Sequence, residues 1–325
     1  MQARNAFRPW VLAAAFAAAV LSSGGAARAD DLVRLITNHK GDWSTVMPLL
    51  GEQQGYFKAE KIKLDITWTD GGSDAQQAII TGAGDIVIQT GTLGVLSAYE
   101  KGAPIRIIGA AMTGSGGLYW YVPKASPIKS FKDANGKTMA FSRPGSSTDL
   151  VSASLAKHFG VNVKRIPGGS PTAVLTQVMS GQIDLGWASA PVFLDKIADG
   201  EIRVVVQGDE APDVLSQTIR VDAVNANWLK AHRDVATRFM RALWKSYEYT
   251  YTKQGMEDYS KMFKTPMSIV SQIPNYATLK AQSFWPVKGI DQTMNEAVQA
   301  KRLKKPLTKA QLDDLIQVVY KPKLD

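Results

Sequence analysis

The residues best suited to hold a ligand form one short run, Arg143-Pro144-Gly145-Ser146-Ser147-Thr148. The run joins an expected strand to the start of an expected helix, and its proline and glycine are residues that shape turns. Hydroxyl groups and free backbone N–H groups at a helix N-terminus attract anions. Arg143 adds a guanidinium that could pair with a carboxylate or a sulfonate. The sequence therefore predicts an anion-binding turn with Arg143, Ser146 and Ser147 as contacts; an ordinary helix cap with a surface arginine is the alternative.

A half-repeat places glycine-rich turns before two further expected helices. Gly71-Gly72-Ser73 and Gly168-Gly169-Ser170 are each followed by an apolar stretch, a glycine and then an aspartate that opens a β-rich run. Each half indicates the order strand, glycine turn, helix, glycine, strand. Two similar α/β lobes leave a crevice between them, and glycine turns at helix N-termini suit a polar ligand there. We therefore expect Gly72 and Ser73 to contact a ligand, with Ser73 capping its helix.

Two strand ends, one in each half, carry small and polar residues at matching places. Gln89-Thr90-Gly91 and Trp187-Ala188-Ser189 lie at the ends of short apolar strands. In open α/β sheets ligands bind beyond the carboxyl ends of the strands. Small side chains let a ligand approach the backbone, and the tryptophan could either stack on it or pack between the lobes. The expected contacts at these ends are Gln89, Thr90, Gly91, Trp187 and Ser189.

The loop after the first expected strand supplies three more candidates, Asn38, His39 and Trp43. His39 lies where open sheets bind ligands, whereas His158 and His232 lie in a last helical turn and in a charged surface stretch, where a structural role is expected. Trp43 could stack on a ligand or pack between the lobes. No two histidines have metal-ligand spacing, and no nucleophile elbow or phosphate-binding lysine motif occurs. The sequence thus predicts binding without catalysis, and neither a metal nor a cofactor.

A regular alternation of expected strands and helices must position these candidates. From residue 32 to residue 206 the alternation has short loops, which predicts a mostly parallel sheet that a second lobe repeats. Gly114, Gly116 and Gly117 form a cluster that we interpret as the first hinge, and the segment 213–216 is the second hinge candidate. Beyond it the chain returns and becomes almost wholly helical. The predicted domains are residues 1–29 as a signal peptide, 30–113 plus 217–325 as lobe 1, and 114–216 as lobe 2.

The first 29 residues have the three parts of a secretory signal peptide. Arg4 and Arg8 precede an uncharged apolar run of about 12 residues, which is too short to span a bilayer. Ala27-Arg28-Ala29 has the small-x-small pattern of a cleavage site. The mature protein is therefore expected to begin at Asp30 and to be periplasmic.

Composition excludes several classes of site. The 325 residues contain no cysteine, which excludes disulfides, thiolate metal sites, a cysteine nucleophile and a lipid-anchored cysteine. The formal charge of +9 falls to +6 if the three arginines of the first 29 residues are removed, and this mildly basic balance fits an anionic ligand. The basic cluster at residues 301–305 is better explained as a solvated helix end than as a nucleic-acid site. We expect no nucleic-acid partner, and a monomer.

Several short motifs occur in an order that is specific for one family. They are Gly55-Tyr56-Phe57, Gly71-Gly72-Ser73, Gly84-Asp85-Ile86, Lys137-Thr138-Met139-Ala140 with Gly145-Ser146-Ser147, and Gly181-Gln182-Ile183-Asp184. In this order the motifs resemble the nitrate/sulfonate/taurine class of periplasmic solute-binding proteins, which includes binders of thiamine-pyrimidine precursors. The resemblance is specific for fold and transport role and weak for the ligand.

The resemblance implies a type II periplasmic binding protein fold, with two α/β lobes, a central cleft, two chain crossings and a helical C-terminal tail. It implies that the loops at 38–43, 89–91 and 145–147 line the cleft, and that the lobes close on the ligand. It also implies delivery to a membrane permease driven by an ATPase subunit.

Three functions other than capture of a small organic anion are compatible with the sequence. They are binding of a thiamine-pyrimidine-like or aromatic ligand, ligand sensing with a membrane receptor, and catalysis on this fold. The related fungal thiamine-pyrimidine synthase relies on a cysteine-rich segment. Because this chain has no cysteine, the sequence disfavours catalysis of that kind.

Overall fold

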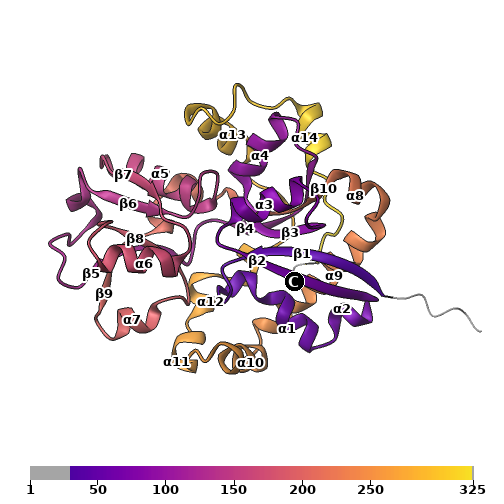
Figure 1. The fold of residues 1–325 in the computed structure, drawn as a ribbon, viewed down its shortest axis with the longest axis horizontal. Helices are drawn as coiled ribbons and strands as arrows, with labels where there is room; N and C mark the ends of the chain where they lie inside the picture. The colour runs from indigo at the N-terminus through magenta and orange to yellow at the C-terminus, as the bar shows by residue number, and fades with distance from the viewer. Residues whose placement is uncertain (1–29, 324–325) are drawn as a thin grey trace, which may run out of the picture. The chain divides into compact units, whose positions relative to one another are not determined.

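The computed structural model describes residues 30–323, so the segment predicted to be a signal peptide lies outside the described residues. The described chain has two groups of strands (Figure 1). The first group is a five-stranded sheet in the order β2-β1-β3-β10-β4, and we call it, with its helices, the first lobe. Its strands are β1 Asp31–Asn38, β2 Ile62–Thr69, β3 Ile86–Gly91, β4 Ile105–Thr113 and β10 Thr218–Asn225.

The second group, with its helices, is the second lobe. It contains a three-stranded sheet in the order β8-β5-β9 and a two-stranded sheet formed by β6 and β7. The strands are β5 Leu118–Pro123, β6 Thr138–Phe141, β7 Lys164–Pro167, β8 Gly186–Ser189 and β9 Ile202–Gln207. They lie in the part of the ribbon that runs from purple through magenta to salmon in Figure 1.

The prediction of mostly parallel sheets is wrong for a large part of both lobes. In the first lobe β1 runs parallel to β2 and β3, but β10 runs antiparallel to both of its neighbours, β3 and β4. In the second lobe β5 is antiparallel to β8 and β9, and only β6 and β7 pair in parallel. The antiparallel strands β5 and β10 are those by which the chain leaves the first lobe and returns to it. A parallel connection needs a long crossover, and these strands are reached without one.

Apolar side chains cover both faces of the first sheet, as expected for strands that carry continuous apolar runs. Leu35 and Ile86 point into one core together with helix α9 (Arg233–Thr250), whereas Ile36 and Val87 point into the other core with α3 (Gly72–Ile80) and α4 (Thr92–Glu100). The apolar residues that recur at helical spacing in α9 are buried, with Val235, Phe239, Ala242 and Leu243 at most 2% exposed.

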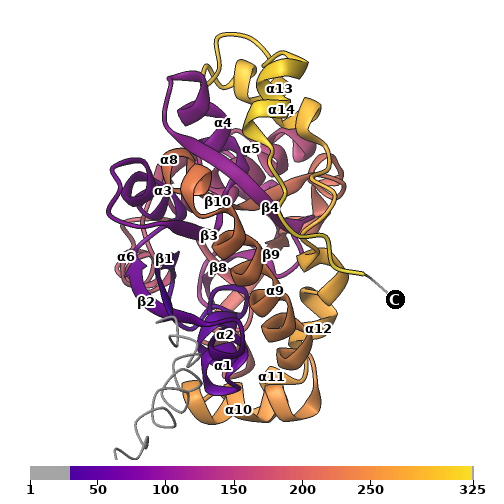
Figure 2. The same ribbon diagram turned by 90° about the vertical axis from the view of Figure 1, so that its right-hand side faces the viewer.

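The remaining helices complete the lobes. The first lobe has α1 Met47–Gln53, α2 Tyr56–Ala59 and α8 Ala226–Ala231, and the second has α5 Ser147–Phe159, α6 Pro171–Met179 and α7 Leu194–Ala198. The helical tail is confirmed. It contains α10 Lys253–Phe263, α11 Met267–Val270, α12 Ile273–Tyr276, α13 Ile290–Gln299 and α14 Lys309–Leu315. Figure 2 shows α13 and α14 beside α4. Within residues 30–323 no helix is long and apolar enough to cross a membrane.

Serine side chains cap two of the helices that follow glycine-containing turns. Ser146 caps α5, accepting a hydrogen bond from the backbone N–H of Asp149, and Ser170 caps α6 in the same way. The cap predicted at Ser73 is wrong, because Gly71 occupies that position with extended backbone and Ser73 lies within the helix. Its hydroxyl donates instead to the carbonyl of Pro144.

Two short segments carry the chain between the lobes. Gly114 and Gly117, both in the left-handed region with φ of 82° and 84°, join β4 to β5. The returning segment passes Leu215 and enters β10, and the N–H of Gly114 donates to the carbonyl of Gln217 at 2.9 Å. The two crossings therefore lie side by side. The domain boundaries and both hinge assignments stay predictions.

We expect the lobes to move about these crossings when a ligand binds, because two adjacent strand-like connections can bend without disturbing either sheet. The radius of gyration, measured by small-angle X-ray scattering, should fall when a cognate ligand is added. An unchanged radius of gyration at ligand saturation would contradict closure.

Candidate functional site

A cavity of about 10 Å³ lies between residues of the two lobes. That volume is about what one water molecule needs, so the surrounding side chains are packed closely. The first lobe contributes Asn38, His39, Gly72, Gln89, Gly91 and Arg220, and the second contributes Ser142, Ser146, Ser147, Thr148 and Trp187.

The N-terminus of α5 forms the second-lobe side of this cavity. The Thr148 hydroxyl accepts from the backbone N–H of Ser142 at 2.8 Å and lies 3.0 Å from the Ser146 hydroxyl. The backbone N–H groups of Ser147 and Thr148 belong to the first turn of the helix, where no intrahelical acceptor exists. Together with the helix dipole they make this end of α5 positive.

Arg220 on β10 faces that helix end from the first lobe. Its Nε donates to the Ser147 hydroxyl at 2.9 Å and its Nη1 donates to the Ser44 hydroxyl at 3.1 Å, although only 4% of the residue is exposed. Burial lowers the pKa of Arg220, whereas the nearby Asp42 and Tyr247 raise it. A guanidinium keeps its charge in proteins. The cavity therefore has a cation on one wall and a positive helix end on the other.

Arg220 is not among the contacts predicted from the sequence, although a signal for it is present there. The strand segment Ile219-Arg220-Val221-Asp222-Ala223 alternates apolar residues with two charged ones. Charged side chains are almost never fully buried unless they are paired or functional. Both Arg220 and Asp222 are buried, on the strand that lies between two other strands.

Other buried polar atoms at the cavity have no partner among the described residues. These are the indole Nε1 of Trp187, the Nδ1 of His39, the hydroxyl of Ser142 and the amide Oε1 of Gln89. Leaving such a group unpaired costs about 1–3 kcal/mol. Among the described residues that line the cavity, none carries a carboxylate. Apart from Gln89 Oε1, which is an acceptor, the arrangement offers hydrogen-bond donors to a group that can accept several of them.

The imidazole ring of His39 at this site is neutral. Burial, and then the charges of Arg220 and Arg143, lower its pKa to about 3. Its ring contacts the Trp187 ring edge-on, with 5.4 Å between the ring centroids. This contact crosses between the lobes, so His39 and Trp187 contribute packing as well as polar atoms.

Asp42 lies beside the cavity and partly balances Arg220. It is buried, and its Oδ1 accepts from the backbone N–H and the hydroxyl of Ser44, both at 3.3 Å. Burial raises the pKa of Asp42, whereas Arg220, Ser44 and a hydrogen bond from Ser189 lower it. Ser189 therefore contacts Asp42 beside the cavity and does not line the cavity itself.

The structure brings many of the predicted contacts to the cavity and leaves others outside it. Those that line it are Asn38, His39, Gly72, Gln89, Gly91, Ser146, Ser147 and Trp187. Those that do not line it are Trp43, Ser73, Thr90, Arg143 and Ser189. Contact of any of them with a ligand stays a prediction.

The residues outside the cavity make other contacts. Trp43 packs against Tyr251 and Tyr259, with ring centroids 5.5 and 5.0 Å apart. The Thr90 hydroxyl donates to the carbonyl of Gly72 at 2.9 Å. These side chains stabilise the loops that carry the lining residues.

Two of the outside residues bridge the lobes instead. The Ser73 hydroxyl donates to the carbonyl of Pro144 at 2.8 Å, and Arg143 Nε lies 3.3 Å from a carboxylate oxygen of Asp74. The Arg143 and Asp74 side chains are 33% and 44% exposed, so this ion pair is reached by solvent.

Gly91 serves the contact between the lobes as well as the cavity. A Cβ atom on Gly91 would lie 2.4 Å from the carbonyl oxygen of Gly145. The same carbonyl accepts from the backbone N–H of Gly94 at 3.0 Å. The absence of a side chain at Gly91 therefore lets the two backbones meet.

A polar cluster behind the cavity holds Gln89 in place. Gln89 has a φ of 57°, which is uncommon for a residue other than glycine. Its N–H donates to Oδ1 of Asp222 at 3.0 Å, and its Nε2 donates to the hydroxyl of Tyr247 at 2.8 Å. Burial raises the pKa of Asp222 to about 8, opposed by the bond from Gln89. Asp222 is therefore a neutral carboxylic acid near pH 7.

One family model matches most of the chain. The profile of the NMT1/THI5-like family matches residues 44–255, well over half of the chain, and the protein belongs to this family. No curated protein sequence matches the chain.

Solved structures of binding proteins share the fold. The alkanesulfonate-binding protein SsuA from Xanthomonas axonopodis pv. citri, bound to MOPS, superposes with a TM-score of 0.72 at 17% identity, covering 88% of this chain and 97% of that chain. The aliphatic sulphonate binding protein SsuA from Escherichia coli gives 0.68 at 16% identity, covering 90% and 94%. The nitrate-binding protein NrtA from Synechocystis PCC 6803 gives 0.67 at 11% identity, covering 88% and 86%.

These comparisons confirm the predicted class and fold. The chain has the two-lobed α/β fold of periplasmic binding proteins, and its resemblance to the nitrate/sulfonate/taurine class is confirmed. The three solved structures named above are of binding proteins, in agreement with the prediction that this chain is not an enzyme.

Replacing Asp222 by asparagine should stabilise the protein at neutral pH. The raised pKa means that folded Asp222 keeps its proton up to about pH 8, whereas the unfolded carboxyl loses it near pH 4. The contribution of the Asp222 carboxyl to the free energy of unfolding is therefore fully present below about pH 4 and is lost as the pH rises to about 8. Asp222→Asn should raise the free energy of unfolding by about 1–4 kcal/mol at pH 7 and by almost nothing at pH 4.

Denaturant unfolding at the two pH values measures this difference. Asp209→Asn, at an exposed carboxylate, is the control and should change little. Equal effects of Asp222→Asn at both pH values would show that Asp222 is ionised in the folded protein.

Arg143 and Asp74 should act as a pair on ligand affinity. Because they bridge the lobes outside the cavity, Arg143→Ala and Asp74→Ala should each weaken binding by less than about 1 kcal/mol, and by similar amounts. Isothermal titration calorimetry of both variants tests this. A loss of about 1.5–3 kcal/mol for Arg143→Ala alone would instead make Arg143 a ligand contact.

Proposed function

We propose that the protein is a periplasmic solute-binding protein that captures a small organic oxyanion by lobe closure and delivers it to an ABC importer. A sulfonate is the favoured head group and a carboxylate the next. The observation that carries this proposal is the buried Arg220, which faces the N-terminus of α5 across a cavity without a lining carboxylate.

The chemistry of the cavity supports an oxyanion in particular. Three kinds of group at the cavity can donate hydrogen bonds but cannot accept them: Trp187 Nε1, the Arg220 guanidinium and the first-turn N–H groups of α5. A tetrahedral sulfonate presents three oxygens, enough to accept from both lobes at once. Such a ligand would bridge Arg220 and Ser147, which already contact each other at 2.9 Å.

The size of the cavity implies the mechanism. A space of about 10 Å³ is smaller than any organic head group, so the lobes must separate to admit the ligand and close again around it. Two related proteins are alkanesulfonate and aliphatic sulphonate binders and one binds nitrate, which supports the same ligand class.

The partners follow from the proposed role. Closure presents both lobes in a fixed relation, which an inner-membrane permease with its ATPase subunits could recognise, with the binding protein acting as a monomer. Export would use the N-terminal signal with cleavage after Ala29. The same closed form could dock on a membrane receptor, and an aromatic or thiamine-pyrimidine-like ligand is the second ligand class to be tested.

Substitutions at Ser147 should distinguish an anion site from an aromatic one. Ser147→Asp places a carboxylate beside Arg220, where it imitates the bound anion, and should abolish binding of anionic ligands. Ser147→Asn, of similar size but uncharged, is the control and should retain measurable binding. Arg220→Met should weaken binding by about 1.5–3 kcal/mol and Arg220→Lys by less.

Calorimetry with a panel of ethanesulfonate, taurine, succinate, nitrate and a hydroxymethylpyrimidine measures these effects, with circular dichroism to verify folding. Anion binding by Ser147→Asp as tight as that of the unchanged protein would contradict the proposal. Selective binding of the pyrimidine, with an affinity that substitution of Arg220 does not change, would support the aromatic alternative.

A further inference from the structure

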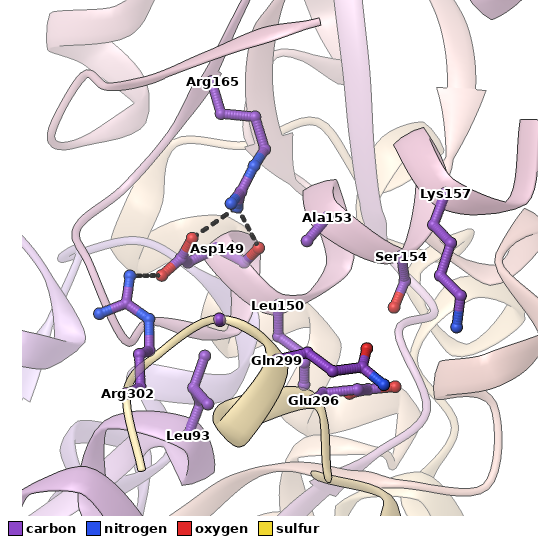
Figure 3. A pocket seen from close by; sticks show the side chains of 11 residues that line it. Leu93, Asp149, Leu150, Ala153, Ser154, Lys157, Arg165, Glu296, Gln299 and Arg302 are labelled. Carbon is purple, nitrogen blue, oxygen red and sulfur yellow. Dashed lines mark hydrogen bonds and ion pairs between the residues drawn. The ribbon is translucent and has the colours of Figure 1, made fainter. Parts of the chain in front are cut away.

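A second and larger pocket lies between α5 and the end of α13. Its volume is about 240 Å³, enough for a small organic molecule, and it is distinct from the cavity at His39 and Trp187. Figure 3 shows its two polar ends, with Leu150 and Ala153 between them.

One end of this pocket is an arginine pair. The buried carboxylate of Asp149 accepts from Arg165 Nη1 at 2.6 Å, from Arg302 Nη2 at 2.5 Å and from the backbone N–H of Gly145 at 2.8 Å. The prediction that Arg302 belongs to a solvated helix end is therefore wrong, because this carboxylate draws it toward the second lobe. Each guanidinium has five N–H donors, and Figure 3 shows both groups beside the pocket, so donors remain for a second acceptor.

The other end carries an acceptor that no described residue uses. Oε1 of Glu296 accepts from the side-chain amides of Gln217 and Gln292 at 3.1 and 3.3 Å, whereas its Oε2 is buried without a partner. Burial raises the pKa of Glu296 above its usual range. Oε2 is closed to the pocket as the side chain stands, and an occupant that donates a hydrogen bond at this end would satisfy it once the Glu296 carboxylate turns toward the pocket.

We propose that this pocket is a second ligand site that takes a small linear molecule with a carboxylate at one end and an amino or hydroxyl group at the other. The carboxylate lies on Arg165 and Arg302, the apolar chain crosses Leu150 and Ala153, and the donor reaches Glu296 Oε2. An ω-amino carboxylate has this pattern.

The position of the pocket couples it to the cleft, if the lobes close as proposed above. The carbonyl of Arg302 accepts from the Ser97 hydroxyl on α4 at 2.9 Å, which ties it to the first lobe. Asp149 and Arg165 belong to the second lobe. The walls of the pocket exist only while the lobes are together, so an occupant favours the closed arrangement and raises affinity in the cleft.

Titration calorimetry with 6-aminohexanoate tests the site directly. The background is Ser147→Asp, which blocks anion binding in the cleft and separates this test from that of the proposed function. Hexanoate lacks the donor and hexylamine lacks the carboxylate. We expect 6-aminohexanoate to bind at least 10-fold more tightly than either; equal binding of hexanoate, or no binding of 6-aminohexanoate, would overturn the proposal.

Two variants locate the binding. Ala153→Phe fills the pocket without changing a polar residue and should abolish the binding of 6-aminohexanoate. Glu296→Gln should remove the preference for 6-aminohexanoate over hexanoate and leave the carboxylate end intact. Unchanged binding by Ala153→Phe would place the ligand elsewhere and overturn the assignment.

Discussion

The burial of Arg220 is the interaction on which the site depends. Taking a guanidinium out of water costs several kcal/mol, and the chain must offset that cost with close partners. Ser44 and Asp42 supply part of the compensation from the first lobe and Ser147 supplies part from the second. Because β10 lies between β3 and β4, the sheet fixes the arginine while its charge faces the other lobe. The site is therefore complete only when the lobes meet.

The electrostatic balance around Arg220 explains why the site suits an anion. His39 stays neutral through burial and the neighbouring cations, and Asp222 stays neutral through burial. Asp42 is the nearby acid that can oppose the arginine, and burial favours its protonated form. Neutral donors, one cation and a helix N-terminus then face the same small space. An oxyanion can accept hydrogen bonds from these donors, whereas a cation would be repelled by Arg220 and by the helix N-terminus.

Much of the fold can be predicted from the sequence, because the signals for these helices and their ends are local. The N-cap at Ser146, the Gly160 that ends α5 at a φ of 64° and the apolar stripe of α9 each depend on neighbouring residues. The same locality placed eight predicted contacts at the cavity, since strand ends and helix starts converge in open sheets.

What the sequence could not provide depends on pairing between distant segments. The direction of β10 is set by the path of the chain back from the second lobe, and no local pattern encodes it. The role of Arg220 depends on Ser44 and Ser147, which lie 176 and 73 residues away in the chain. Arg302 resembles a solvated surface residue until Asp149, 153 residues away, is brought beside it. Such charges gain their function only through the tertiary fold.

The central claim, that a buried arginine holds an oxyanion between the lobes, is tested most directly by identifying the native ligand. Native mass spectrometry of the protein purified from the periplasm, before and after denaturation, would give the mass and charge of whatever it carries. We predict a small sulfonate or carboxylate, present in the unchanged protein and absent from Arg220→Met. A neutral or cationic molecule carried equally by both proteins would contradict the account.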